Sequence, residues 1–292
     1  MINKRAAYNL CLGKMEGRDP ARRSVLRYVV LKAKLRFANF VVSQRLAFSF
    51  DIAKDAMPSK SISKSIIFLY ITLCTFLFSC HTDAQNLQVI PKPQMCLEME
   101  KIGLIDVQSV DPSIRVVLPY ASADNFTKTA LYQNSQYAYL QPDIAEKLAK
   151  ASQLLRQKHS NYRLLVLDAA RPLSVQRVMW DVVKNTPFRY YVANPNKTGL
   201  HNYGAAVDVT ITDDLGVELD MGTPFDFFGE EAHPVKEDDM LKQGKLTQTQ
   251  INNRRLLRKV MREAGFTICP TEWWHFNACS LLEAKKKYEL IP

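Results

Sequence analysis

Acidic residues are scarce in the first 84 residues of this 292-residue chain, and this scarcity accounts for most of its net charge of +10. Residues 1–84 contain 14 Lys and Arg but only 5 Asp and Glu, whereas residues 85–292 contain 25 and 24. The larger C-terminal part is therefore nearly neutral. A nearly neutral domain lacks the excess of basic residues that binding to phosphate backbones requires, so the composition argues against nucleic acid as a partner.

No two cysteines stand in a CxxC pair, the spacing that commonly marks zinc bound by thiolates. The sequence therefore does not indicate a cysteine-based zinc site. If the segment up to residue 84 is removed or modified during export, three cysteines remain in the mature chain, namely Cys96, Cys269 and Cys279. An oxidising compartment would permit a disulfide between two of them, and the sequence leaves the pairing open.

The chain also lacks an apolar run with the roughly 20 residues that a membrane-spanning helix requires. The run from Ile66 to Ser79 has 14 residues and follows two basic residues, Lys60 and Lys64. A short apolar run behind a basic segment is typical of a signal peptide. We therefore expect residues 57–84 to direct export, either to the periplasm or to the membrane surface as an anchored lipoprotein.

The end of this segment allows two outcomes. Leu77 to Cys80 resembles a lipobox, and two acyl chains on Cys80 would suffice for stable membrane attachment. Cleavage after Ala84 would instead release a soluble protein. The basic residues 1–56 precede the expected signal and indicate either a start codon placed too far upstream or a cytoplasmic extension, in which 22–42 could lie on a membrane as an amphipathic helix.

The remaining chain shows no internal repeat or low-complexity run, so we expect a linker over 85–96 and one catalytic domain over 97–292. Apolar residues recur at helical spacing, and Thr247 with Gln250 forms a capping-box pattern. Helices are predicted over 141–159, 174–185 (with Ser174 as its cap) and 247–266. Strands are predicted over 114–118, 164–168, 205–212 and 272–277. This mixture indicates an α+β fold in which helices flank a small antiparallel sheet.

The stretch HNYGAAVDVTI, residues 201–211, places a histidine and an aspartate beside a β-branched run. In a strand, the alternating aliphatic residues face the core and Asp208 faces the other side. His201 lies before Gly204, where a turn at little conformational cost can direct it towards Asp208. By itself, this pair fits a polar contact at a sheet edge as well as it fits a metal site.

A second stretch, EWWHF, supplies Glu272 and His275. Together with His201 and Asp208, it provides two histidines and one carboxylate, with a second carboxylate to spare. A catalytic zinc typically has three protein ligands and a water, and a nearby glutamate takes the proton of that water. Two clusters with complementary contents favour a metal site over two unrelated polar contacts.

The combined pattern, H-x6-D followed by E-x-x-H, resembles that of the zinc D-alanyl-D-alanine dipeptidases, whose group also includes D,D-carboxypeptidases and hedgehog-like domains. The resemblance implies that His201, Asp208 and His275 bind Zn²⁺ and that Glu272 is the catalytic base. It also implies a single zinc-peptidase domain whose substrate is the small dipeptide D-Ala-D-Ala.

Three further stretches resemble segments of the same family, so that the matches extend from Ile114 to Phe276. LDAARP corresponds to a D-x-x-R-P segment, which implies that Arg171 stabilises the oxyanion. YASADNF implies that Tyr120 helps to hold the free amino group of the substrate. MGTPFDFF implies that Asp226 pairs with the same ammonium.

One position departs from the family pattern. The family commonly has serine two residues before the first zinc histidine, where this chain has Gly199. A hydroxyl that would hold the substrate carboxylate is missing there, and the neighbouring Thr198 could replace it. His233 is a second-rank candidate for the pocket lining, and Trp273 and Trp274 are expected to pack around the metal.

We therefore predict a zinc dipeptidase that hydrolyses D-Ala-D-Ala in cell-wall peptide turnover or in glycopeptide resistance. Two alternatives are a D,D-carboxypeptidase that trims longer wall peptides and a binding module that zinc stabilises without catalysis. Asp226 argues against the carboxypeptidase, because an ammonium-binding carboxylate has no partner in a peptide extended at its N-terminus. Glu272 and Arg171 argue against the binding module, because neither is needed merely to hold zinc.

Overall fold

The computed structural model describes residues 92–292. The expected signal segment 57–84, with Cys80, and the basic extension 1–56 lie outside the described residues, so these expectations stay predictions. Within the described part, no helix is both long and apolar enough to cross a membrane. The first helix there, α4 (Gln94–Lys101), begins before residue 97, where the sequence placed the start of the catalytic domain.

A five-stranded sheet with the order β2-β4-β5-β7-β6 forms the centre of the fold. Its strands are β2 (Arg115–Val116), β4 (Arg163–Asp168), β5 (Ala206–Thr212), β6 (Thr267–Ile268) and β7 (His275–Asn277). Neighbouring strands are antiparallel, as predicted, except that β2 and β4 are parallel. Helix α6 (Pro142–Lys158) lies between these two strands in the chain, and such a crossover allows the second strand to run in the same direction as the first. A second, two-stranded sheet pairs β1 (Ile105–Asp106) with β3 (Tyr139–Leu140).

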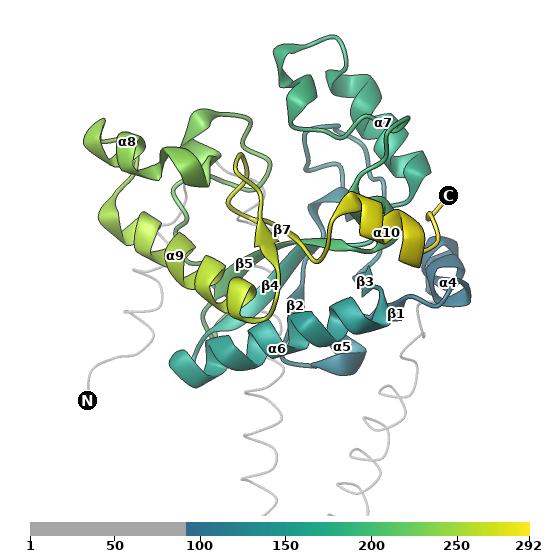
Figure 1. Ribbon diagram of the computed structural model, residues 1–292, viewed down its shortest axis with the longest axis horizontal. Helices are drawn as coiled ribbons and strands as arrows, with labels where there is room; N and C mark the ends of the chain where they lie inside the picture. The colour runs from purple at the N-terminus through teal and green to yellow at the C-terminus, as the bar shows by residue number, and fades with distance from the viewer. Residues whose placement is uncertain (1–91) are drawn as a thin grey trace, which may run out of the picture. The chain divides into compact units, whose positions relative to one another are not determined.

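Helices surround this sheet, which confirms the α+β fold (Figure 1). Besides α4 and α6 they are α5 (Val107–Val110), α7 (Leu173–Val183), α8 (Glu237–Lys242), α9 (Gln248–Glu263) and α10 (Leu281–Lys287). Single 3₁₀ turns are η2 (Pro119–Ala121), η3 (Pro187–Tyr190), η4 (Leu200–Tyr203), η5 (Glu230–Ala232) and η6 (Pro234–Lys236). Helices α6 and α9 pack against each other, whereas α7 lies at the opposite end of the view in Figure 1.

Apolar side chains from α6, α9 and the central strands form the main core. Ile144 and Leu148 of α6 and Leu257 and Val260 of α9 are fully buried in one cluster with the aliphatic residues of β5. Side chains alternate between the two faces of a strand, so this packing directs Asp208 to the other face of β5. The core thus determines which side of the sheet carries the polar residues.

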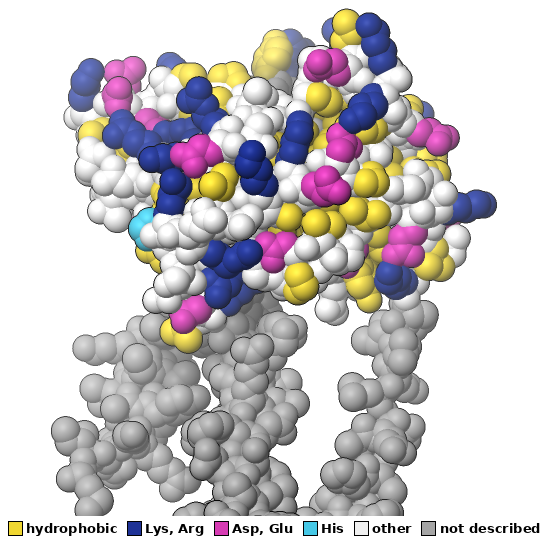
Figure 2. Space-filling model, turned by 60° about the horizontal axis from the view of Figure 1, so that its bottom comes forward, with side chains coloured by type: hydrophobic (Ala, Val, Ile, Leu, Met, Phe, Trp, Pro, Cys, Tyr) yellow, Lys and Arg dark blue, Asp and Glu magenta, His cyan; other side chains and the backbone are white. Residues whose placement is uncertain are grey.

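The surface carries charges of both signs. On the face seen in Figure 2, Lys and Arg side chains are interspersed with Asp and Glu. This distribution agrees with the near neutrality of residues 85–292.

The predicted helices are found with small changes at their ends. The predicted capping box opens α9, because the backbone N–H of Gln250 donates to Thr247 Oγ1 over 3.3 Å and that of Thr247 donates to Gln250 Oε1 over 2.8 Å. Ser174 is not the cap of α7, contrary to the prediction, because Pro172 is extended and the helix starts directly after it. The predicted strand around Glu272 is also too long, because β7 pairs with its neighbours only from His275 onward.

Candidate active site

The strand register places three polar residues side by side across the sheet. Asp168, at the end of β4, pairs with Asp208 on β5, which in turn pairs with His275 on β7. His201 joins them from η4 because the chain turns at Gly204, whose φ is 63°. A Cβ added at this glycine would lie 2.9 Å from the end of a leucine side chain, so the left-handed backbone and the limited space both favour glycine.

Three side chains of metal-ligand type converge at this point. His201 Nε2 lies 3.1 Å from His275 Nδ1, and Asp208 Oδ1 lies 3.4 Å and 3.0 Å from these two nitrogens. Their ligand atoms, one from each residue, all lie within 4.8 Å of one another. Within residues 92–292, no other group of three His, Cys, Asp or Glu residues is arranged in this way. The predicted ligands His201, Asp208 and His275 are therefore brought together.

The outer nitrogen of each imidazole is hydrogen-bonded to the protein. His201 Nδ1 donates to the carbonyl oxygen of Ala169 over 2.6 Å, and His275 Nε2 donates to Asn277 Oδ1 over 2.7 Å. These bonds orient both rings so that His201 Nε2 and His275 Nδ1 point at each other and at the Asp208 carboxylate. Burial alone would raise the pKa of Asp208, yet the two histidines hold that pKa well below its ordinary value. Two ring nitrogens and a carboxylate that converge in this way form a donor set suited to a metal cation.

Glu272 lies in the loop before β7, beside the cluster of His201, Asp208 and His275 but not part of it. Its Oε2 is 3.8 Å from His275 Nδ1. Burial raises the pKa of Glu272 to about 7. A carboxylate with a pKa near neutrality can take up and release a proton during a reaction, as a general base must.

Arg171 follows β4 and is held by a network of buried side chains. Asp168 Oδ2 accepts hydrogen bonds from Nε of Arg171, over 2.9 Å, and from Nη2. Gln176 Oε1 accepts one from Nη1 over 3.0 Å, and the Tyr132 hydroxyl donates to the other oxygen of Asp168 over 2.6 Å. Nη2 also lies 3.9 Å from Asp208 Oδ2, so the guanidinium reaches the cluster of ligand-type residues.

Tyr120 and Asp226 form a direct pair on another side of the site. The hydroxyl of Tyr120 donates to Asp226 Oδ2 over 2.6 Å. Burial is the largest effect on Asp226 and raises its pKa to about 7. The backbone of Asp226 has a φ of 59°, a left-handed conformation that is uncommon for a residue with a side chain.

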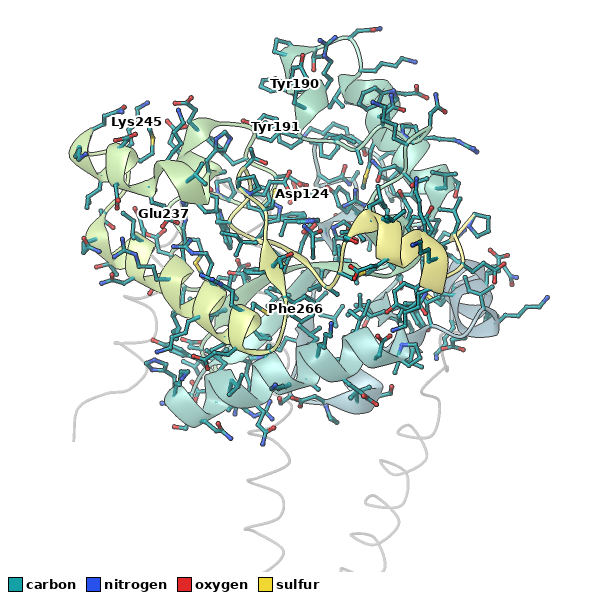
Figure 3. The ribbon with its side chains drawn as sticks, viewed as in Figure 1. Asp124, Tyr190, Tyr191, Glu237, Lys245 and Phe266 are labelled. Atoms are coloured by element: carbon teal, nitrogen blue, oxygen red, sulfur yellow. The ribbon has the colours of Figure 1, made fainter. Side chains whose placement is uncertain are left out.

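All seven predicted site residues line one cavity of about 170 Å³; they are Tyr120, Arg171, His201, Asp208, Asp226, Glu272 and His275. Phe126, Met179, Phe228 and Trp274 supply apolar wall. Tyr191, labelled in Figure 3 on the segment after η3, also lines it. Its hydroxyl lies 2.9 Å from His233 Nε2, so His233 is connected to the cavity through Tyr191.

Comparison with known proteins identifies this arrangement. The sequence profile of the D-Ala-D-Ala dipeptidase family matches residues 100–289. The chain belongs to this family. It is 32% identical over 174 residues to a D-alanyl-D-alanine dipeptidase of Escherichia coli, and the alignment covers 60% of this chain and 83% of that protein. It is 31% identical over 206 residues to one from a Synechocystis species (60% and 79%) and 27% identical over 194 residues to one from Enterococcus faecium (60% and 91%).

Family membership confirms the resemblance that the H-x6-D and E-x-x-H motifs indicated, but the motifs missed the residues that support the site. The LDAARP stretch indicated a role for Arg171 but none for Asp168. An aspartate three residues before a buried arginine is nevertheless well placed to form an ion pair with it, as Asp168 does. Tyr132 and Gln176 carried no such signal, because their contacts with Asp168 and Arg171 depend on the fold.

The position at which the chain departs from the family pattern lies at the cavity. Gly199 lines the cavity, and a Cβ there would lie 3.1 Å from the Ala193 methyl group. A serine at this position would therefore require a small shift of Ala193. The hydroxyl of Thr198 donates instead to the carbonyl oxygen of Lys197 over 2.6 Å.

The two tryptophans lie at the cavity wall and directly behind it. Trp274 lines the cavity, and the buried Trp273 packs edge-on against Trp274, with ring centroids 5.3 Å apart.

The three cysteines within residues 92–292 are free thiols, so the disulfide that an oxidising compartment would permit is not formed among them.

Proposed function

We propose that this protein is a zinc-dependent dipeptidase that hydrolyses D-Ala-D-Ala to two molecules of D-alanine. The observation that carries the proposal is the position of Glu272 and Arg171 beside a His-Asp-His cluster, in a cavity that also holds the Tyr120–Asp226 pair. The cluster would hold the metal, Glu272 would transfer the proton and Arg171 would stabilise the oxyanion. The Tyr120–Asp226 pair would recognise a free amino terminus.

His201, Asp208 and His275 would hold the metal through two nitrogens and one carboxylate oxygen. Three protein ligands of this kind, with a further position open to water or substrate, are typical of catalytic zinc. When bound, zinc polarises the scissile carbonyl and lowers the pKa of a bound water. The hydrogen bonds from the outer nitrogens to Ala169 and Asn277 orient both imidazoles for this task.

Glu272 takes the proton of the attacking water and passes it to the leaving amine. Its raised pKa suits both steps, because a carboxylate with a pKa near 7 accepts a proton readily and returns it as readily. Its side chain is only 15% exposed and lines the cavity, where the leaving amine would be formed. The products are two free amino acids.

Arg171 donates hydrogen bonds to the carbonyl oxygen of the substrate as negative charge develops on that oxygen. A guanidinium carries five N–H donors. The bonds to Asp168 and Gln176 fix the plane of the group, and Arg171 lines the cavity. A donor held in place before the reaction stabilises a developing oxyanion without reorganisation.

Asp226 and Tyr120 bind the free ammonium group of the dipeptide. An ammonium stabilises the ionised form of a buried carboxylate, whereas an acylated nitrogen offers no charge and leaves that carboxylate unpaired. This preference favours a dipeptidase over a D,D-carboxypeptidase, whose substrates are extended at that nitrogen.

An assay of substrate length tests the proposal. The full-length protein is incubated with D-Ala-D-Ala, with L-Ala-L-Ala and with a wall pentapeptide ending in D-Ala-D-Ala, and released alanine is measured by HPLC. We expect hydrolysis of D-Ala-D-Ala alone. Release from the pentapeptide in preference to the dipeptide would favour the carboxypeptidase, and no release from any substrate would favour a binding module.

We further propose that residues 57–84 export the protein, so that the catalytic domain faces the periplasm, either released after cleavage or anchored to the membrane through a lipidated Cys80. The basic, short apolar segment and the lipobox-like Leu77–Cys80 support this location. In that compartment the reaction would serve cell-wall peptide turnover or glycopeptide resistance. Membrane fractionation of cells that express the wild type or Cys80→Ala tests the anchor, since only the wild type should sediment with membranes.

A further inference from the structure

The residue proposed to bind the substrate ammonium lies on a long loop without regular strands. This segment, residues 221–231, is called here the Asp226 loop; it lies between β5 and α8 and ends in η5. Asp226 occupies a left-handed conformation, with a φ of 59°. Such a conformation costs free energy and persists only where surrounding contacts hold it.

Arg254 of α9 holds both ends of the Asp226 loop. Its Nε donates to the carbonyl oxygen of Met221 over 2.6 Å, and its Nη1 donates to that of Glu231 over 2.9 Å. The Arg254 side chain is fully buried, and burial lowers its pKa only to about 10, so it stays charged near neutral pH. Charged donors form stronger hydrogen bonds than neutral ones, and the planar fork matches two fixed acceptors.

Glu237 holds the charge of Arg254 in place. Its Oε1 lies 3.7 Å from Arg254 Nη1, and its two oxygens also accept hydrogen bonds of 2.7 Å and 2.6 Å from Arg258. Glu237, the first residue of α8 and labelled in Figure 3, is itself buried. Because Arg258 reaches no residue of the loop by a hydrogen bond of its own, it provides a natural comparison for Arg254.

Trp273 connects the same loop to the segment that carries Glu272. Its indole N–H donates to Thr223 Oγ1 over 2.8 Å, and Arg254 Cζ lies 5.7 Å from the centroid of its ring. Trp273 is buried and directly follows Glu272 in the chain. The proposed base and the proposed ammonium-binding residue are thus joined through one tryptophan and one arginine, neither of which lines the cavity.

We infer that Arg254 and Trp273 are positioning residues that hold the Asp226 loop against α9 and the Glu272 segment, and that they thereby set the preference of the enzyme for a free amino terminus. This inference rests on the proposed function. Neither residue touches the substrate, so their effect should appear in substrate binding and selectivity, and much less in the rate of the chemical step.

Two variants with a matched control test the inference in the full-length protein. Arg254→Lys keeps a positive charge but loses the fork between Met221 and Glu231, and Trp273→Phe keeps an aromatic ring but loses the bond to Thr223. Arg258→Lys removes a comparable forked ion pair from the same helix without touching the loop. For each protein, kcat and KM are measured with D-Ala-D-Ala and N-acetyl-D-Ala-D-Ala, and amide hydrogen exchange is measured over residues 221–231.

We expect Arg254→Lys to raise KM for D-Ala-D-Ala by about 10-fold, the scale of losing one charge-assisted hydrogen bond, and Trp273→Phe to raise it by about fivefold, the scale of losing one neutral hydrogen bond. In both variants kcat should change by less than about threefold. The preference for the free over the acetylated dipeptide should fall by a similar factor, and exchange in the loop should accelerate. Arg258→Lys should retain the wild-type preference and loop exchange, even where it lowers thermal stability.

Unchanged selectivity and unchanged loop exchange in Trp273→Phe would overturn the inference, and this variant decides the matter if Arg254→Lys does not fold. An equal loss of selectivity in Arg258→Lys would also overturn it, because the effect would then follow from general destabilisation. Failure of the wild type to hydrolyse D-Ala-D-Ala would refute the proposed function instead. Amide hydrogen exchange in the Asp226 loop is measured without substrate. Wild-type exchange rates in both variants would therefore still refute the role of Arg254 and Trp273 in holding the loop.

Discussion

The hydroxyl of Tyr120 donates a hydrogen bond of 2.6 Å to Asp226, although 106 residues separate the two in the chain. The tyrosine comes from η2 beside the central sheet, and the aspartate comes from the Asp226 loop. Both residues line the cavity that also contains the His-Asp-His cluster, and the pair brings a carboxylate into it. The cation that pairs with this carboxylate, an ammonium group at the end of a short peptide, is the main determinant of substrate length in the proposed reaction.

Asp226→Asn removes the charge of this carboxylate and keeps its size. The wild type should cleave free D-Ala-D-Ala and reject N-acetyl-D-Ala-D-Ala, because acylation removes the charge that compensates the partly buried carboxylate. The variant should lose activity on the free dipeptide and discriminate less between the two. HPLC of released D-alanine measures both. Equal cleavage of the two substrates by the wild type would contradict the dipeptidase proposal and favour the carboxypeptidase.

His201→Ala should remove most of the bound metal. The purified wild type is expected to contain about one zinc per chain, because the site offers three protein ligands, and two ligands bind zinc far less tightly. His159→Ala is the control, since His159 stacks on Tyr162 away from the cluster. Elemental analysis decides: full zinc in His201→Ala would show that His201 is not a ligand.

The sequence could indicate that His201 and Asp208 lie together because their spacing is local. Six residues lie between them, and one turn at Gly204 is enough to bring them together, whereas His275 comes from a distant strand. The capping box of α9 was predictable for the same reason, since it involves only Thr247 and Gln250. The alternation along β5 also predicted which side of the strand Asp208 faces.

Contacts that depend on strand register or on loop packing were not predictable in this way. Tyr132 meets Asp168 across 36 residues, and Arg254 meets Met221 across 33, with no pattern in either stretch to indicate the partner. The parallel pairing of β2 with β4 likewise depends on the path of the intervening chain. Such residues position the site, and side-chain type alone does not reveal that role.

Glu272→Gln should retain zinc and the fold while losing most of the turnover. The amide keeps the shape of the side chain but cannot accept the proton of the water, and general-base catalysis typically contributes about 10² to 10⁴ in rate. Zinc content and thermal stability, measured on the same sample, show whether the site is otherwise intact. Turnover close to that of the wild type would place the base at another residue.

Arg171→Lys keeps the positive charge but loses the planar donors that Asp168 and Gln176 orient. We expect kcat to fall by about 10²-fold or more, the scale of losing one oxyanion donor, with a smaller change in KM. Arg163→Lys at the start of β4 is the control, because Arg163 donates to the nearby backbone carbonyls of Ser160 and Tyr162 and does not line the cavity. A change confined to KM would make Arg171 a residue for ground-state binding.

The pH dependence of kcat/KM should reveal the ionisation of Asp226. Burial raises the pKa of this carboxyl to about 7, so in the free enzyme the group is protonated below pH 7 and ionised above it. Only the ionised form pairs with the ammonium of the substrate, and kcat/KM reports the free enzyme and free substrate. Activity should therefore rise as the pH increases through 7, and it should fall again above about 8, where the α-amino group of the dipeptide loses its proton.

Comparison with Asp226→Asn separates this ionisation from every other group that titrates in the same range. Below pH 7, the slope of log(kcat/KM) against pH should be smaller in the variant by about one unit, since one required deprotonation has been removed. The falling limb above pH 8 should become shallower as well, because an amide gains little from the charge on the substrate. Identical slopes on the acidic side would show that Asp226 is already ionised there, and that burial does not control its charge in the free enzyme.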